Sequence, residues 1–209
     1  ITKRLDAAWV VGTNQGGIDT GAKAATTMYA VWLIKRSDTG VVDALFSTSF
    51  TAPTMPASYD RKRLIGSVVT DATPNIIAYT QAGDYFRYTG DVIQDISDAT
   101  ITSDTFETGT VSVPPSCLAH LYTLNSNPTA TNSPGRIVVR TVGAADAPNT
   151  DSENFASIET SGTFDHVAAT GWVLTNASRQ IEYAASAGTG SSTVTIRTIG
   201  FTMLTRTNP

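Results

Sequence analysis

The chain has 209 residues, a formal net charge of −4 and only 15% charged residues, against about 25% in an average globular protein. The acidic balance excludes a general nucleic-acid binder, which needs a basic face to displace counterions. An apolar content of 41% excludes a disordered chain, since such chains lack the residues for a core. The longest apolar run, Tyr29–Ile34, is far shorter than the roughly 18 residues of a membrane span, so no membrane insertion is expected.

The first part of the chain predicts strands and turns. A strand is predicted at Leu5–Val11, and the loop Asn14–Gly17 follows it. Two runs of alternating apolar residues, Thr27–Arg36 and Val41–Phe50, then flank the turn Ser37–Gly40. Alternation with a period of two is typical of strands, and a glycine that closes a short turn indicates a positive φ. We therefore predict a β-hairpin, with strands at Tyr29–Arg36 and Val41–Ser49, followed by strands at Arg63–Thr70, Ile76–Gln81 and Tyr85–Tyr88.

Two segments of this part have less distinct patterns. Gly21–Met28 is the best helix candidate, but it lacks capping residues and predicts a short helical turn at most. The basic cluster Arg61–Arg63 follows Asp60 and enters a strand. A solvated strand end is favoured there over a phosphate site.

The second half contains many short strands separated by clusters of glycine, proline, asparagine, aspartate and serine, which favour turns. Strands at near-regular spacing without intervening helices favour an all-β fold, an antiparallel β-sandwich or a jelly-roll-like arrangement. The predicted strands are Thr100–Phe106, Thr110–Val113, Leu118–Asn125, Arg136–Val142, Phe155–Glu159, Gly171–Thr175, Gln180–Ala185 and Ser192–Arg206.

A composition change near Thr89–Asp98 predicts a domain boundary. Aromatic and basic residues are dense before it, and a Thr- and Ser-rich acidic segment follows. We expect a small hairpin-rich β-subdomain over residues 1–90 and a β-sandwich over residues 91–209. The alternative, in which both halves contribute sheets to one sandwich, stays open at this point.

The last predicted strand changes phase at Gly200. Val194, Ile196 and Thr198 share one face before it, and after the shift Phe201 and Met203 share one face. A glycine at a phase change indicates a β-bulge or bend. The Thr- and Ile-bearing outer face is expected to pack against either a sister chain or a second sheet of the same chain.

Candidate catalytic groups lack the context that their chemistry needs. Asp19 and Asp38 each begin an Asp-Thr-Gly tripeptide, but an aspartic protease needs two buried carboxylates that share a proton. Asp19 follows a loop, and Asp38 lies at a hairpin tip beside Arg36. No nucleophile elbow or phosphate loop occurs. The glutamates, which a glycosidase would use in pairs from distant strands, lie in no recognisable signature: Glu107, Glu153, Glu159 and Glu182. We expect no enzymatic activity.

Metal and cysteine chemistry is equally weakly indicated, and no cofactor is expected. The loop Ala144–Asn154 collects oxygen ligands of the kind that Ca²⁺ prefers, in a spacing that fits no EF-hand. His120 and His166 lie alone in different segments, and His120 is interpreted as a structural strand histidine. The single Cys117 excludes an intrachain disulfide and is expected to be a small buried side chain.

Sugar binding fits the aromatic residues better. Flat apolar rings can support a pyranose while amide and carboxylate groups bind its hydroxyls. The alternative is that these rings belong to the core, as most aromatic residues of β-proteins do, and Trp9 and Trp32 are assigned to it. The candidate glycan-binding residues are Tyr85, Phe86, Tyr88 and Trp172, with Asn127, Asn132, Asp146 and Asp151 from the loops Asn125–Gly135 and Gly143–Ser152.

Four segments of the first part, GGIDTG, TTMYAVWLIKRSDTGVVDALFSTS, TAPTMPASYDRKRLIGSVVTD and QAGDYFRY, resemble a module of phage and prophage tail-fibre or virion-spike proteins in order and spacing. The later VSVPPSCLAHLYTLNS is similar to the opening of the sandwich that follows this module. The resemblance implies a virion-surface location, a homotrimer, contacts with other virion proteins and a terminal domain for host attachment. It implies no particular binding residues.

These observations together predict a non-enzymatic attachment domain that binds a host cell-surface polysaccharide. Three copies would raise the effective affinity by about 10² or more, since later contacts become intramolecular. Two alternatives remain: a purely structural virion component that binds only other virion proteins and, less favoured, a polysaccharide-degrading accessory domain. The first residue is Ile rather than Met, so we expect the chain to be a fragment of a larger parent.

Overall fold

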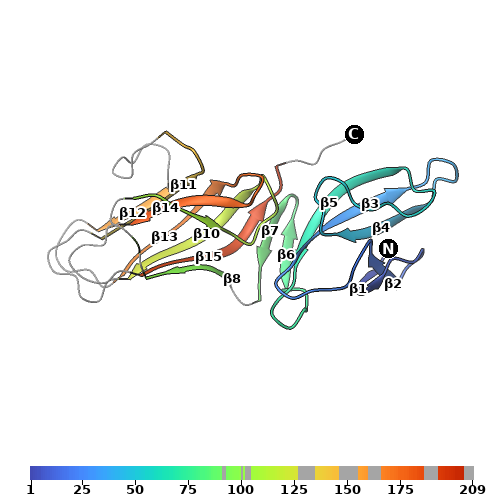
Figure 1. The fold of residues 1–209 in the computed structure, drawn as a ribbon, viewed down its shortest axis with the longest axis horizontal. Coiled ribbons are helices and arrows are strands. Elements are labelled where there is room, and N and C mark those ends of the chain that lie inside the picture. Colours follow the sequence, from blue (N-terminus) through green and yellow to red (C-terminus); the bar gives the residue numbers. More distant parts are fainter. Residues whose placement is uncertain are drawn as a thin grey trace. The chain divides into compact units, whose positions relative to one another are not determined.

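A computed structural model (Figure 1) describes residues 1–90, 93–99, 101, 105–126, 135–145, 155–159, 166–185 and 193–204. Strands and turns make up the secondary structure of these residues, and no helix occurs among them, so the predicted all-β fold is confirmed. No helix of the described residues is therefore long and apolar enough to cross a membrane. The chain divides into an N-terminal unit, Ile1–Ala78, and a C-terminal unit that starts at Tyr79 and includes Leu204.

The N-terminal unit is a five-stranded sheet. Its strands lie in the order β1 (Lys3–Ala8), β2 (Gln15–Ile18), β4 (Val42–Ser47), β3 (Met28–Lys35) and β5 (Arg61–Val69). The predicted hairpin is confirmed: β3 and β4 are antiparallel, and Gly40 in their turn has φ 74°. The sheet is mixed, because β2 is parallel to both β1 and β4.

Strand β2 lies where a loop was expected, and its glycines explain why. A Cβ on Gly16 would stand 2.1 Å from the Ala8 carbonyl oxygen, and one on Gly17 would stand 2.9 Å from the Phe46 ring. Side-chain-free residues are therefore required for β2 to fit against its neighbours. Two adjacent glycines show no apolar alternation, so the pattern could not indicate a strand.

The segment Gly21–Met28 is a loop with one turn rather than a helix. The Tyr29 hydroxyl accepts a hydrogen bond from the Ala24 amide at 2.9 Å, and the Thr70 hydroxyl donates to the Ala24 carbonyl at 2.7 Å. These side chains satisfy backbone groups that a helix would have paired internally. Arg61 and Arg63 are exposed on β5, as expected for a solvated strand end.

The C-terminal unit is a β-sandwich of two sheets, visible as two layers in Figure 1. The larger sheet has the order β13 (His166–Leu174), β10 (Leu118–Ser126), β15 (Thr193–Thr202), β7 (Tyr85–Tyr88) and β6 (Tyr79–Ala82), and β8 (Ile93–Asp98) also pairs with β15. The smaller sheet has the order β12 (Phe155–Glu159), β11 (Gly135–Thr141), β14 (Gln180–Ala185) and β9 (Glu107–Thr110).

The unit boundary differs from the expected one near residue 90. Strand β7 pairs with β15 through Tyr85, Phe86 and Arg87, so the β6–β7 hairpin belongs to the C-terminal unit. Strand β8, in the segment taken as the boundary, pairs with the same β15. Thr105 and Phe106, the end of the predicted strand Thr100–Phe106, are not in a strand. The strand predicted at Thr110–Val113 lies earlier in the chain, as β9 at Glu107–Thr110.

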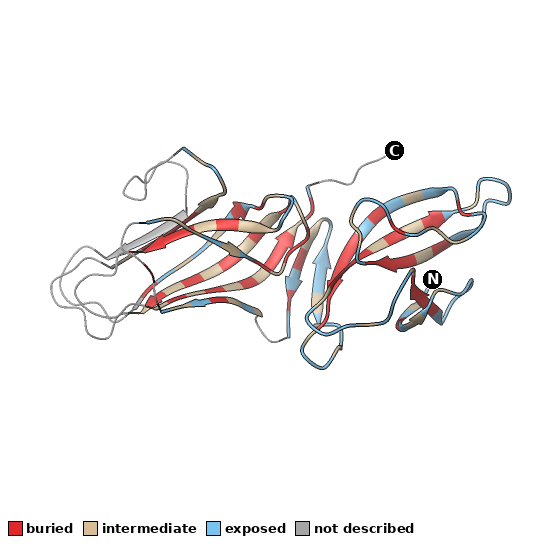
Figure 2. Cartoon of the chain, viewed as in Figure 1, coloured by how far each residue is buried: buried red, intermediate tan, exposed pale blue. Residues whose placement is uncertain are grey.

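Alternating burial along β10 and β15 forms the core of the sandwich (Figure 2). Inward residues of the two strands are buried while their neighbours on the outer face remain half-exposed, as a sheet covered on one side requires. The fully buried side chains of this core include Val111, Val113, Leu121, Ile137, Ile181, Ile196 and Phe201. Cys117 is also buried, as expected, and burial raises the pKa of its thiol to about 12.

The predicted phase change at Gly200 is confirmed. Leu121 lies opposite Thr198 and His120 opposite Gly200, so Ile199 is the extra residue of a β-bulge. Val194, Ile196 and Thr198 are buried before the bulge, and Phe201 and Met203 are buried after it. The bulge keeps apolar side chains on the core face along the whole strand.

Candidate functional site

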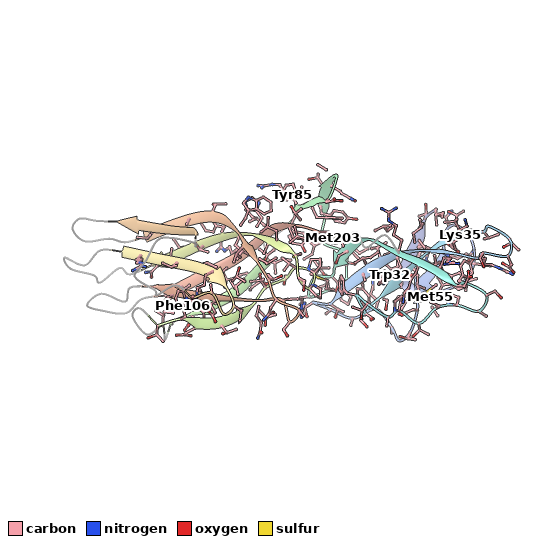
Figure 3. The ribbon with its side chains drawn as sticks, turned by 90° about the horizontal axis from the view of Figure 1, so that it is seen from above. Trp32, Lys35, Met55, Tyr85, Phe106 and Met203 are labelled. Carbon is pink, nitrogen blue, oxygen red and sulfur yellow. The ribbon has the colours of Figure 1, made fainter. Side chains whose placement is uncertain are left out.

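Three rings from three strands meet on the outer face of the larger sheet, the face turned away from the smaller sheet. They are Tyr85 of β7, His120 of β10 and Trp172 of β13, and we call them the aromatic cluster. His120 and Trp172 are directly opposite each other in the β10–β13 register. Tyr85, labelled in Figure 3, reaches them from the other side of β15.

The rings make specific contacts. The imidazole of His120 stacks on the indole of Trp172, with centroids 4.1 Å apart and planes at 10°. The Tyr85 ring stands edge-on to the indole at 5.3 Å, a geometry that aromatic quadrupoles favour. A hydrogen bond of 3.0 Å joins the Tyr85 hydroxyl to Nδ1 of His120. Three side chains from distant parts of the chain are thus held in one arrangement.

Gly200 makes this arrangement possible. It lies on β15 between Tyr85 and His120, opposite Arg87 on one side and His120 on the other. A Cβ here would stand 2.4 Å from the Phe86 carbonyl oxygen and 3.1 Å from the Tyr85 ring. The tyrosine can lie across β15 only because no side chain rises from that position.

The charge around the cluster comes from one arginine. Partial burial lowers the pKa of His120, and the positive charge of Arg87 lowers it further. The imidazole is therefore neutral at neutral pH, with one nitrogen that donates a hydrogen bond and one that accepts. Arg87 is exposed.

The structure separates the predicted aromatic residues into two groups. Trp172 is 42% exposed and Tyr85 is half-buried, and the cluster brings them together. Phe86 and Tyr88 point to the opposite face and are only 2% and 8% exposed. Phe86 stacks on Phe201 in the core, at 4.8 Å. Their expected role in ligand contact is therefore corrected: neighbours on a strand face opposite sides, so all three residues of one strand could not serve one surface.

The other predicted residues lie outside the described part of the chain. These are Asn127, Asn132, Asp146 and Asp151. Trp32 is buried as expected, whereas Trp9 is half-buried and stacks edge-on against Tyr59. His120 was interpreted as structural, and its place in the cluster was missed because its partners are set by strand register. The alternation along β10 was the one available signal, because it places His120 on the same face of the strand as Leu118 and Tyr122.

The two Asp-Thr-Gly tripeptides do not form a carboxylate pair that shares a proton. Asp19 accepts backbone hydrogen bonds from Thr20 at 2.7 Å and Thr54 at 2.9 Å, which fixes a loop. Asp38 is exposed and forms a bidentate ion pair with Arg36, which lowers its pKa to about 2. A catalytic pair needs one carboxyl whose pKa is raised. Among the described residues, no group of three His, Cys, Asp or Glu could hold a metal ion.

Three other acidic residues have structural partners within the sandwich. Tyr183 of β14 donates its hydroxyl to Asp98 of β8 at 3.1 Å, and Glu107 lies 3.5 Å from the same oxygen. Burial and these two carboxylates raise the pKa of the tyrosine. Glu182 accepts a 2.6 Å hydrogen bond from its cross-strand partner Arg140. These contacts join β8 to β14 and β14 to β11.

Burial raises the pKa of the Asp95 carboxyl group of β8 above its ordinary value of 3.8. The Ser112 hydroxyl donates to it at 2.6 Å and the Thr198 hydroxyl donates to its other oxygen. These two hydrogen bonds favour the charged form, but burial outweighs them. The carboxyl faces the sandwich, opposite to the aromatic cluster.

This burial predicts a pH dependence of stability. When the folded pKa is higher than the unfolded pKa, the folded protein binds more protons between the two values, so its stability falls as the pH rises through that window. We expect Asp95→Asn to remove this fall, and the melting temperature of the wild-type protein relative to the variant to decrease as the pH rises from 4 to 7. Thermal unfolding of both proteins at each pH measures it, and a constant difference would contradict the prediction.

Fold and site together define a two-unit all-β protein with an exposed aromatic cluster on the outer face of a sandwich. No protein-family model matches the chain, and no curated protein shows a significant sequence match to it.

Proposed function

We propose that the chain is a non-enzymatic attachment domain that binds a glycan of a cell surface through the aromatic cluster. The virion-surface setting of this proposal rests on the resemblance of the N-terminal segments to tail-fibre and spike modules. The glycan-binding part rests on the geometry of Tyr85, His120 and Trp172.

The observation that carries the proposal is the exposed indole within a fixed group of polar and aromatic neighbours. Trp172 keeps 42% of its surface exposed although it is stacked on His120. Binding sites for small ligands combine such apolar surface with a few placed polar groups. The Tyr85 hydroxyl and the His120 imidazole provide groups that can donate and accept hydrogen bonds beside the ring. Sugars present the same combination of an apolar ring face and hydroxyls.

Trp172→Ala is expected to abolish most of this binding. Truncating an aromatic residue at the centre of a binding surface costs about 2 kcal/mol or more, which is a loss of at least about tenfold in affinity. Binding to a glycan array, followed by titration calorimetry with the best oligosaccharide, measures the loss. Leu174→Ala is the matched control, since Leu174 lies on the same face of the same strand and is 41% exposed.

If Leu174→Ala reduces glycan binding as much as Trp172→Ala does, general disturbance of β13 explains the loss and the assignment of the cluster fails. If the wild-type protein binds no glycan on the array or on whole cells, glycan attachment itself is contradicted. Release of reducing ends from a bound polysaccharide would replace attachment by the enzymatic alternative.

The structural alternative has its own supporting observation. Leu174 and Trp172 are both exposed apolar residues on the outer face of β13, and apolar patches of this kind also mark protein interfaces. In that case the face is covered by a sister chain, as in the expected trimer, or by another virion protein. Light scattering of the isolated chain distinguishes the cases: a trimer that Leu174→Ala dissociates favours the structural role over glycan binding at this face.

A further inference from the structure

We propose that the aromatic cluster and Arg87 together bind a sugar that carries a carboxylate, a uronic acid of an acidic polysaccharide. This inference rests on the glycan binding proposed above and specifies its ligand class. It is argued from the distribution of charge on the C-terminal unit and from the strand register around the cluster.

Charges are unevenly distributed over the C-terminal unit. Residues 79–204 contain twelve acidic and five basic side chains, so the net charge of the unit disfavours an anionic ligand. The described strand residues on the outer face of the larger sheet are an exception, because none of them is an aspartate or glutamate. The two aspartates of β8 face inward, where Asp95 bonds Thr198 and Asp98 bonds Tyr183.

The same face carries two arginines, Arg87 on β7 and Arg197 on β15. Neither makes an ion pair within the described part of the chain. Elsewhere in this unit Arg140 is paired with Glu182 at 2.6 Å. A face with unpaired arginines and no carboxylate, on an otherwise acidic unit, is complementary to an anion.

The register places Arg87 in line with the cluster. Arg87 lies opposite Gly200, Gly200 opposite His120, and His120 opposite Trp172, so one row crosses four adjacent strands. Neighbouring strands are about 4.8 Å apart, and the Tyr85 ring lies over Gly200, between the guanidinium and the imidazole. A ligand that lies across this ring can contact the exposed part of the indole with a ring face and the guanidinium with a charged group.

A carboxylate matches these groups better than a polysulfated chain. A guanidinium binds a carboxylate through two parallel hydrogen bonds in one plane. A polysulfated chain requires a cluster of basic residues, and all four lysines of the protein lie before residue 63. One guanidinium beside the cluster suits the single charge of one uronic acid.

The test compares each acidic sugar with its own uncharged form. Oligogalacturonate, oligoalginate and hyaluronan oligosaccharides are immobilised beside their methyl esters, neutral malto-oligosaccharides and sulfated heparin fragments. Wild type is expected to bind at least one uronate about tenfold more tightly than its methyl ester, because hydrogen bonds to charged groups are the strong ones. Arg87→Met is expected to abolish this preference, Arg87→Lys to retain part of it, and Arg63→Met, an exposed strand arginine of the N-terminal unit, to leave it unchanged.

The outcomes separate the two proposals. Two results would overturn the uronate assignment and leave glycan attachment standing. In the first, Trp172→Ala removes the binding, but the wild-type protein does not distinguish the acid from its ester. In the second, Arg87→Met leaves the binding intact. Binding only to the sulfated fragments overturns the uronate assignment as well. No binding to any oligosaccharide contradicts glycan attachment itself, and the ligand class falls with it. Circular dichroism of each variant shows whether the sandwich is folded.

Discussion

Asp43→Ala is expected to lower the free energy of unfolding of the N-terminal unit by about 3–5 kcal/mol, because it leaves a buried ammonium group without its partner. Lys3 Nζ and Asp43 Oδ2 are 2.9 Å apart, and their side chains are only 2% and 3% exposed. The carboxylate also accepts backbone hydrogen bonds from Gly12 at 3.0 Å and Ala44 at 2.7 Å. Lys3 donates to the Val10 carbonyl at 2.6 Å.

The loss of one partner of a buried ion pair has a different effect on stability from the replacement of both. Removing one partner strands a charge in a medium of low dielectric constant, whereas replacing both by apolar side chains of similar volume is often neutral. The double variant Lys3→Met/Asp43→Leu should therefore recover much of the stability that Asp43→Ala loses. The double variant also removes the carboxylate that accepts hydrogen bonds from the Gly12 and Ala44 amides, so the recovery of stability is expected to be incomplete.

Denaturant unfolding followed by circular dichroism measures these changes, with the two units fitted as separate transitions. Asp38→Ala is the control: Asp38 is paired with Arg36 at 2.7 Å, but its side chain is 57% exposed. Solvated ion pairs contribute little, so Asp38→Ala should leave the transition almost in place. Equal effects of the two aspartate substitutions would mean that burial of the Lys3–Asp43 pair does not govern its contribution.

Local patterns predicted the strands whose side chains alternate, and the failures have physical causes. β3 and β4 were predicted because apolar residues alternate on both sides of a glycine turn. β15 was predicted because its residues alternate, and its bend was predicted because this alternation shifts at Gly200. β2 has two glycines, which carry no pattern. β8 contains Asp95 and Asp98, which resemble loop residues in the sequence although their partners Thr198 and Tyr183 lie inside the sandwich.

The candidate site was partly predictable for the same reason. Tyr85 and Trp172 were nominated as flat, polar-edged rings, and the alternation of β7 could have separated Tyr85 from Phe86. Which rings meet depends on strand pairing between residues far apart in the chain. His120 faces Trp172 only because β10 and β13 pair in one register, and Tyr85 reaches both only because β7 pairs with the far edge of β15. Such long-range pairing leaves no trace in local periodicity.

Gly200→Ala is expected to separate the aromatic cluster and to destabilise the C-terminal unit by about 1–3 kcal/mol, the usual cost of overpacking. The new methyl group would stand 2.4 Å from the Phe86 carbonyl oxygen, which is backbone and cannot rotate away. β7 must therefore move away from β15, to which it is joined by three residue pairs. Movement of β7 withdraws Tyr85 from His120 and displaces Arg87, so glycan binding is expected to be lost together with stability.

Tyr85→Phe and Thr195→Ala serve as controls for this prediction. Tyr85→Phe removes the hydrogen bond to His120 and leaves β7 in place, so it should weaken binding without the loss of stability. Thr195 lies on the same face of the same strand and is half-buried, and its replacement should change neither property strongly. Thermal unfolding and oligosaccharide titration on all three variants provide the comparison. A Gly200→Ala protein with unchanged melting temperature and binding would show that Tyr85 does not depend on the bare backbone beneath it.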